Sequence, residues 1–265
     1  MEIITSKNNS KVILARKLHD KKYRDQNSLY IFEGYKLFFE AWHCNLPIAY
    51  ILLSQSGYQR YGAEIERAPY EFYVLHDDVY AKISLEGAPQ GILCVGKYID
   101  KINFSTTIEI ENSDQKDRIF ALENIQDPGN LGTMIRSAVA FGYDRLLLSG
   151  GCADVYHPRT IRASMGAVFK IRVDAVSDFP SSLKTLRDSG YEIYSAELRD
   201  YSKSLRQLKI SERTIFVVGN EGSGITAETS AVSCGSVMID IVNMESLNAS
   251  AAASILMWES SKSFR

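Results

Sequence analysis

Three segments of the chain gather glycine, asparagine, acidic and hydroxyl residues within a few positions of one another. The first is NIQDPGNLGTMIRSA, residues 124–138, in which Arg136 lies in an apolar helical pattern directly after the turn-forming cluster 127–130. The others are GNEGSG at 219–224 and VNMESLN at 242–248. An arginine guanidinium keeps its charge at ordinary pH and offers a planar fork of donors to anions. Arg136 is therefore the first candidate for chemistry, and the later segments are candidates to line the same site.

A parallel sheet is the arrangement that would bring these segments together. Each follows an apolar run that predicts a strand, at 118–122, 214–218 and 236–241, and further strands are predicted at 145–149, 171–173 and 191–196. Helical patterns fall between them at 131–141, 159–169, 179–189, 226–233 and 247–261. This alternation is typical of an α/β fold whose parallel sheet is covered on both faces. Ligands bind such sheets beyond the carboxyl ends of the strands, where all three segments are expected.

The residues before this pattern predict a second, smaller α/β layer. Strands are predicted at 29–33, 48–54, 71–75 and 92–96, and helices at 11–20 and 35–42. The interval 99–117 is polar and weakly patterned, as expected of a linker. We therefore predict a smaller domain at 1–98, a linker at 99–117 and a larger domain at 118–265.

The composition is that of a globular protein without a metal centre or a membrane span. Hydrophobic residues make up 45% and charged residues 23% of the 265 positions, which favours a packed core. The longest apolar runs are too short to cross a bilayer, and the amino terminus has no apolar run like that of a secretory signal. The four cysteines and four histidines are scattered, with no C-x-x-C pair. We expect a cytoplasmic protein with no metal site.

Positive charge concentrates at the amino terminus, although the whole chain has a net charge of -2. Residues 1–36 hold eight bases against four acids. Such a patch on a nearly neutral protein is either a surface that faces phosphate or an ordinary solvated helix face. The bases are Lys7, Lys11, Arg16, Lys17, Lys21, Lys22, Arg24 and Lys36.

Two further features leave alternatives open. The segment 219–224 is neither G-x-G-x-x-G nor a P-loop, so it is either a plain strand-to-helix turn capped by Thr226 or a place where a ligand ring approaches bare backbone. The run ASAAAS at 249–254 carries only small side chains. It indicates either good helix propensity or a crowded junction, in a subunit interface or beneath a ligand.

The same three segments resemble the motifs of the SpoU/TrmH family of the SPOUT class, which are RNA ribose methyltransferases. DPGNLGTMIRSA, FVVGNEGSGI and ESLNASAA are similar to its three motifs in order and spacing, over about residues 118–260. ITSKNNSKV, KKYR and IFEGYKL resemble the substrate-binding domain often fused to these enzymes, a ribosomal-protein-like α/β RNA binder. The resemblance implies a carboxy-terminal trefoil knot that binds S-adenosylmethionine in a bent form, and a homodimer whose subunits share each active site.

Individual roles follow from the resemblance, position by position. It implies that Arg136 clamps an RNA phosphate beside the reacting ribose. It assigns the cofactor to the backbone of Gly219, Ile239 and Leu247. One position departs from the family: Asp240 replaces the usual proline of Ile-Pro-Met, which is expected to loosen the cofactor pocket. The residues that the motifs place at the catalytic site are Asn130, Arg136, Glu221, Ser246 and Asn248.

The expected substrate is RNA, with 23S ribosomal RNA first and transfer RNA second. A non-catalytic RNA-binding relative is the other reading, which Asp240 mildly favours. Contacts to RNA are expected through phosphate and shape, as A-form recognition requires. The residues expected to make them are Lys7, Arg16, Lys17, Lys21, Lys22, Arg24 and Arg162.

Overall fold

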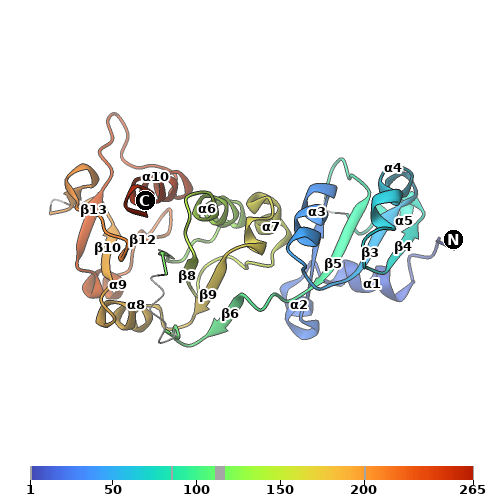
Figure 1. Ribbon diagram of the computed structural model, residues 1–265, viewed down its shortest axis with the longest axis horizontal. Helices are drawn as coiled ribbons and strands as arrows, with labels where there is room; N and C mark the ends of the chain where they lie inside the picture. Colours follow the sequence, from blue (N-terminus) through green and yellow to red (C-terminus); the bar gives the residue numbers. More distant parts are fainter. Residues whose placement is uncertain (1, 85, 111–116, 200, 265) are drawn as a thin grey trace. The chain divides into compact units, whose positions relative to one another are not determined.

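The computed structural model describes residues 2–84, 86–110, 117–199 and 201–264. The contacts divide the chain into two compact units (Figure 1). One comprises Met1–Asp100 and Asp154–Phe169, and the other comprises Lys101–Ala153 and Lys170–Arg265. Both are α/β, so the predicted fold class is confirmed. The smaller unit also includes residues 154–169, which the predicted boundaries assign to the larger domain.

The smaller unit is built on a mixed sheet with the strand order β1-β4-β3-β5-β2. Alternate residues of its strands face opposite sides, and α1 packs with Val79, Tyr80 and Ile83 on one of them. Figure 1 shows α3 and α4 on the other side. The strands are β1 (Ile3–Ile4), β2 (Leu29–Glu33), β3 (Ile48–Ser54), β4 (Phe72–Leu75) and β5 (Ile92–Lys97). The helices are α1 (Ser10–Lys17), α2 (Lys21–Asn27), α3 (Tyr35–His43), α4 (Gln55–Ile65) and α5 (Asp77–Tyr80).

The segment 154–169 folds with this smaller unit, although its sequence lies inside the predicted larger domain. The ring centroids of Tyr156 and Tyr30 are 4.8 Å apart, and those of Phe169 and Phe32 are 5.5 Å apart. The predicted single helix 159–169 is wrong, because Met165 and Gly166 both adopt positive φ. That break leaves α7 (Pro158–Ser164) and the short 3-10 helix η1 (Ala167–Phe169).

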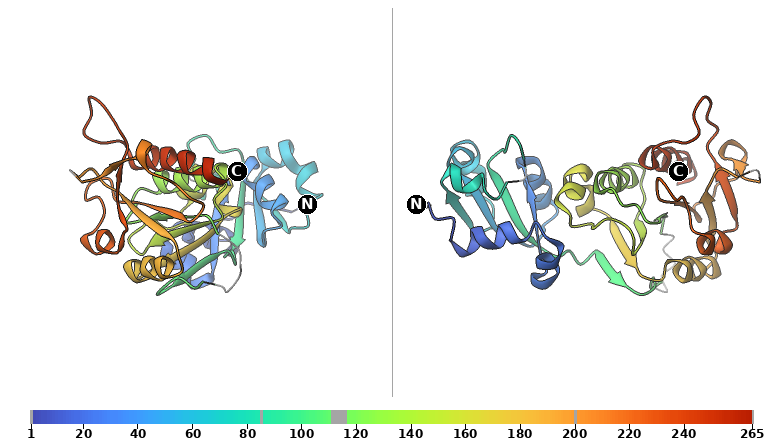
Figure 2. Two further views of the ribbon diagram at one scale, coloured as in Figure 1. Left: turned by 60° about the vertical axis from the view of Figure 1, so that its left-hand side comes forward. Right: turned by 180° about the vertical axis from the view of Figure 1, so that it is seen from behind.

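The larger unit is an eight-stranded sheet in which every strand pair is parallel, in the order β11-β13-β10-β12-β7-β8-β9-β6. Its strands are β6 (Ile102–Ser105), β7 (Ile119–Leu122), β8 (Arg145–Ser149), β9 (Arg172–Val176), β10 (Glu192–Ala196), β11 (Lys203–Ser204), β12 (Thr214–Val218) and β13 (Gly235–Met238). α8 (Phe179–Asp188) and α9 (Ala227–Val232) pack against the core cluster on one face. On the other, α6 (Pro128–Ala140) and α10 (Ala249–Ser261) lie side by side (Figure 2).

The interval 99–117 is not a featureless connection where the structure describes it. β6 lies within it and pairs in parallel with β9, from Ile102 opposite Val173 to Ser105 opposite Val176. A four-residue edge strand is too short for periodicity to reveal, which explains the wrong prediction. Residues 111–116, the acidic part of the predicted linker, lie outside the described residues.

Within the described ranges, every helix is too short or too polar to span a lipid bilayer. The same residues contain no group of three or more histidine, cysteine or acidic side chains placed to hold a metal ion.

Candidate active site

The cluster 127–130 is the start of helix α6 rather than a separate turn. Asp127 is its N-cap and accepts a 2.8 Å hydrogen bond from the backbone N–H of Asn130. Pro128 occupies the first helical position, where its missing N–H costs nothing. The predicted turn is therefore wrong, because the helix begins at Pro128 rather than at Leu131, and Arg136 lies in its third turn.

Asn130 joins the three segments at one place. Its side-chain amide donates a 2.6 Å hydrogen bond to Glu221 Oε1 in the loop after β12. Its Oδ1 lies 3.4 Å from the donor Nδ2 of Asn248, at the start of α10. These contacts span 91 and 118 residues of sequence. The structure thus brings together Asn130, Glu221 and Asn248, which we call the amide junction.

Asn248 is held in the amide junction by its second role as the N-cap of α10. Its Oδ1 accepts hydrogen bonds from the backbone N–H groups of Ser250 (2.9 Å) and Ala251 (3.3 Å). A capping side chain of this kind satisfies donors that the first helical turn leaves free. The position of the amide that approaches Asn130 is therefore fixed by the helix itself.

The small residues of α10 serve a crowded junction between helices. α10 runs parallel to α6, since Asn248 meets Asn130 and Ser254 meets Ser137 one to two turns later. The two serine hydroxyls are 2.8 Å apart, and Ala253 is fully buried. Larger side chains here would push the helices apart, so ASAAAS forms a crowded junction between two helices of one chain, whereas the predicted subunit interface or ligand contact stays a prediction.

Glu123 ties the end of β7 to the start of α9, the helix that follows β12, and sequence reasoning missed this role. The side chain is 3% exposed and accepts hydrogen bonds from Thr226, through N–H (3.0 Å) and Oγ1 (2.7 Å), and from Thr229 Oγ1 (2.8 Å). Asn220 adds a 2.9 Å hydrogen bond from Nδ2 to the carbonyl of Asn124. The sequence signal for this role was an acidic residue directly after an apolar strand, with no basic residue close by in sequence to pair with it.

An apolar cavity opens beside these loops, at the carboxyl ends of β10 and β13. It contains three of the predicted site residues: Ile239, Ser246 and Leu247. Gly219 is not among the described residues that line it. A Cβ at Gly219 would approach the carbonyl oxygen of Gly224 to 2.4 Å, so glycine is required there for the loop to close. The lining comprises Ala196, Glu197, Leu198, Val237, Met238, Ile239, Ile241, Glu245, Ser246, Leu247 and Ala252.

Asp240 interacts with the edge of the sheet. Its Oδ2 accepts a 2.5 Å hydrogen bond from Ser204 Oγ and lies 3.5 Å from Nε of Arg206. The two neighbours of Asp240 in sequence, Ile239 and Ile241, both line the cavity. The acid that replaces the usual proline therefore anchors this cavity wall to β11 and the turn after it.

Arg136 does not belong to the amide junction of its own chain. It is exposed and makes no hydrogen bond or ion pair with another residue that the structure describes. It lies six positions after Asn130, a distance of ~9 Å along the helix axis. Its guanidinium is therefore available to an anion from outside this chain.

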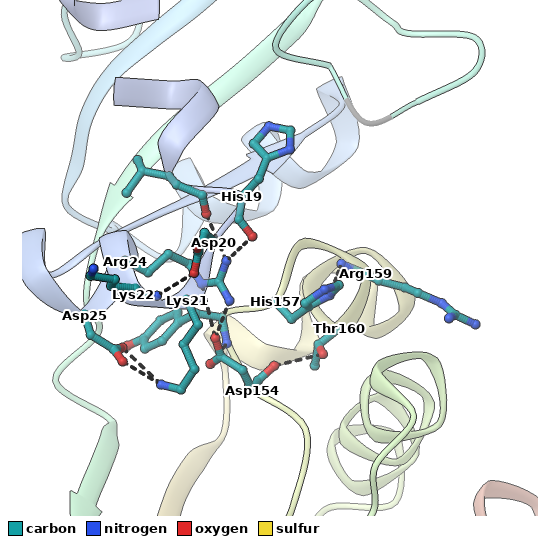
Figure 3. Close-up of polar contacts among 12 residues, drawn as sticks. His19, Asp20, Lys21, Lys22, Arg24, Asp25, Asp154, His157, Arg159 and Thr160 are labelled. Atoms are coloured by element: carbon teal, nitrogen blue, oxygen red, sulfur yellow. Dashed lines mark hydrogen bonds and ion pairs between the residues drawn. The ribbon is translucent and has the colours of Figure 1, made fainter. Parts of the chain in front are cut away.

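Arg24 is a buried structural residue, so its prediction as an RNA contact is wrong. It is 1% exposed, and Nε and Nη2 donate to Asp154 Oδ2 at 3.1 and 2.6 Å (Figure 3). Nη1 donates to the carbonyls of Leu18 (2.9 Å) and His19 (2.8 Å), beyond the end of α1. A guanidinium engaged in this way cannot also reach a phosphate in solvent. It fastens the segment that follows Asp154 to α1 and α2.

The other predicted RNA contacts are at the surface. Lys21 forms a 2.8 Å ion pair with Asp25, and Arg162 forms one with Glu86. Burial raises the pKa of Asp25, but hydrogen bonds from Lys21 and Tyr98 outweigh it and hold that pKa below its usual value. The exposed bases of the set are Lys7, Arg16, Lys17, Lys21, Lys22 and Arg162.

Comparison with known proteins covers both halves of the chain. Residues 117–258 match the SpoU rRNA Methylase family, and residues 9–94 match the MRM3-like substrate binding domain. The chain is 30% identical to the 23S rRNA (guanosine(2553)-2′-O)-methyltransferase RlmP of Bacillus subtilis (strain 168), over 97% of this chain and 98% of that one. It is 29% identical to the mitochondrial rRNA methyltransferase 3 of Xenopus tropicalis, over 64% of this chain and 40% of that one. The AdoMet-bound rRNA methyltransferase from Sinorhizobium meliloti has a similar structure, with a TM-score of 0.83 and 25% identity over 98% and 97% of the two chains.

Proposed function

This chain belongs to the SpoU rRNA methylase family of RNA methyltransferases, and on that premise we propose that it transfers a methyl group from S-adenosylmethionine to a ribose 2′-oxygen of RNA. The observation that carries this proposal is the amide junction. It joins three separate motifs at the carboxyl edge of a parallel sheet, beside an apolar cavity. That edge is where ligands of such sheets bind.

The cavity fits S-adenosylmethionine in its chemistry. Its walls are mostly aliphatic, which suits an adenine ring, and they come from strand ends and loops whose backbone groups can bind the ring's polar edge. Ile239 and Leu247 would hold the adenine side, and Gly219 keeps the neighbouring loop closed. The bound molecule supplies an electrophilic methyl group on a sulfonium. The chain's task is to place the ribose oxygen in line with it, which contributes up to ~7–11 kcal/mol in favourable cases.

Arg136 is the residue proposed to act on the RNA. A guanidinium has no free lone pair to accept a proton, so we assign it to binding the phosphate and stabilising the charge that develops on the ribose oxygen. The amide junction orders the loops of Glu221 and Ser246 around the reacting groups. The proton then passes to phosphate or water.

A homodimer accounts for the position of Arg136. This side chain lies about two helical turns from its own amide junction, which supports the proposal that it serves the site of a second copy. Exposed apolar side chains in the loop before α10, Val242 (83%) and Met244 (72%), supply surface for such contacts. We also propose the trefoil knot: the chain leaves β13 near the edge of the sheet, and α10 returns to pack on α6 and on the central strand β12.

The proposed substrate is 23S ribosomal RNA, with transfer RNA as the alternative. The name of the Bacillus subtilis relative, which matches nearly end to end, supports the first choice. A cytoplasmic location is also proposed, supported by four cysteines that form no disulfide.

Two measurements test this function. Calorimetric titration with S-adenosylmethionine should show saturable binding, and its absence would favour a non-catalytic RNA-binding relative. Mass-spectrometric mapping of ribosomal and transfer RNA from cells with and without the gene should reveal one ribose methylation that depends on it. A gene-dependent methyl group on a base instead of a ribose would contradict the proposal.

A further inference from the structure

Helix α3 presents a row of aromatic side chains at its surface, in which Phe39 and His43 are exposed and Tyr35 and Trp42 are half-buried. Tyr35, Phe39, Trp42 and His43 follow the i, i+4, i+7, i+8 spacing of one helix face, and Tyr61 of α4 extends the row. The rings of Tyr61 and Tyr35 stack at 4.5 Å with an interplanar angle of 13°. The ring centroids of Tyr35 and Phe39 are 6.1 Å apart, and those of Phe39 and His43 are 4.1 Å apart. We call these five residues the aromatic strip.

The aromatic strip is a surface feature held in a fixed geometry. The core-facing residues of α3 are Leu37, Phe38 and Ala41, whereas Phe39 is 42% exposed and His43 is exposed. His43 Nδ1–H donates a 2.9 Å hydrogen bond to the carbonyl of Phe39, which fixes the imidazole over the phenyl ring. Exposed apolar surface that is organised in this way marks an interaction site.

Polar and cationic groups surround the rings. Phe39, Trp42 and His43 line a recess together with Asn45, Glu64 and Arg67. The exposed cations nearby are Lys36, Arg60 and Arg67, and the guanidinium of Arg60 lies 5.8 Å from the centre of the Tyr61 ring. Flat faces for stacking, amide and carboxylate groups for base edges and cations for phosphates are the three requirements of single-stranded nucleic acid binding.

We propose that the aromatic strip binds an unpaired stretch of the RNA substrate by stacking its bases. This inference rests on the proposed function, in that RNA is the substrate. α3 and α4 lie within residues 9–94, the range that matches a substrate binding domain. Helices α3 and α4, which carry the aromatic strip, lie on the opposite side of the smaller sheet from α1 (Figure 1). In this proposal the exposed basic side chains of α1 and α2 contact phosphates, and the aromatic strip selects unpaired nucleobases. These basic side chains are Arg16, Lys17, Lys21 and Lys22.

Trp42 provides a direct probe, because the chain has only two tryptophans. In a Trp258→Phe background, Trp42 is the single indole. A short unstructured oligoribonucleotide should quench its emission on binding, and a duplex of equal length should not. Phe39→Ala should weaken single-strand affinity at least about fivefold, since one stacked base contributes ~1–3 kcal/mol. Phe39→Tyr keeps a ring and should retain affinity, and Lys22→Ala should weaken both RNAs alike.

The outcomes separate this inference from the proposed function. If anisotropy of labelled RNA shows saturated binding while Trp42 emission is unchanged, the aromatic strip is not the contact, and RNA binding itself still stands. Unchanged single-strand affinity in Phe39→Ala would overturn the inference in the same way. Trp42 emission that depends on protein concentration without RNA would assign the strip to self-association instead. Failure to bind any RNA would remove both proposals together.

Discussion

The side chain of Asn130 donates a hydrogen bond of 2.6 Å to Glu221, joining the first turn of α6 to the loop after β12 across 91 residues of sequence. Asn130 also approaches Asn248, so one amide contacts both later motifs. Replacing it by alanine removes a hydrogen bond to a charged acceptor, which contributes ~1.5–3 kcal/mol. We expect Asn130→Ala to lower the single-turnover methylation rate about 10- to 100-fold. Asn130→Asp should lower it further, because two carboxylates would then face each other.

The control for this prediction is Thr133→Ala, an exposed change one turn further along α6. It should keep the wild-type rate. Wild-type rates in both Asn130 variants would show that the amide junction has no part in catalysis.

Asn248 has two functions that substitutions can separate. Asn248→Ala removes the N-cap of α10 and should lower the free energy of unfolding by about 1 kcal/mol, or the Tm by about 2–4 °C. Asn248→Ser keeps a capping oxygen but lacks the amide that approaches Asn130, so its Tm should stay near wild type while methylation falls. Thermal melts beside single-turnover assays give both values. Equal losses of Tm in the two variants would contradict this division.

The buried ion pair of Arg24 and Asp154 predicts a large stability effect without a matching effect on RNA contacts. Arg24→Met leaves a buried carboxylate unpaired and should destabilise the protein by about 3–5 kcal/mol in urea unfolding. The double variant Arg24→Met, Asp154→Leu removes both charges and should recover much of that loss. A stable Arg24→Met protein with weak RNA binding would instead restore the role expected from sequence.

Exposed lysines of the amino-terminal patch should act through phosphate contacts. The logarithm of RNA affinity should fall linearly with the logarithm of salt concentration. Lys17→Ala and Lys22→Ala should each reduce that slope by about 0.7–0.9, the value for one released counterion. Fluorescence anisotropy at several salt concentrations measures the slope. Affinity that does not change with salt would exclude this surface as the phosphate contact.

Strand positions could be predicted well from sequence, because strands such as β3 and β12 are continuous apolar runs whose ends are set by polar residues. α4 was missed because Gly57 and Gly62 give it weak helix propensity. The structure explains why one of these two glycines is needed: a Cβ at Gly57 would approach the carbonyl oxygen of Gly91 to 2.1 Å. That contact between distant residues is invisible in the local pattern.

The charge of a single residue was the least informative sequence signal for predicting an RNA contact. Counting Arg24 with the surface bases overlooked that its hydrogen-bond partner lies 130 residues away. The meeting of the three motifs was predictable, because strand ends of a parallel sheet share one edge. The position of Arg136 relative to them was not, since it depends on where α6 begins.

The most direct test is in-vitro methylation of unmodified ribosomal RNA with S-adenosylmethionine, followed by nucleoside mass spectrometry. The wild-type protein should produce a single 2′-O-methylated nucleoside. Arg136→Ala should bind S-adenosylmethionine normally yet lose about 10²–10³ of the rate, as expected when a donor to developing negative charge is removed. Arg136→Lys should retain an intermediate rate, because it keeps the charge without the planar fork. A base-methylated product, or a wild-type rate in Arg136→Ala, would contradict the account.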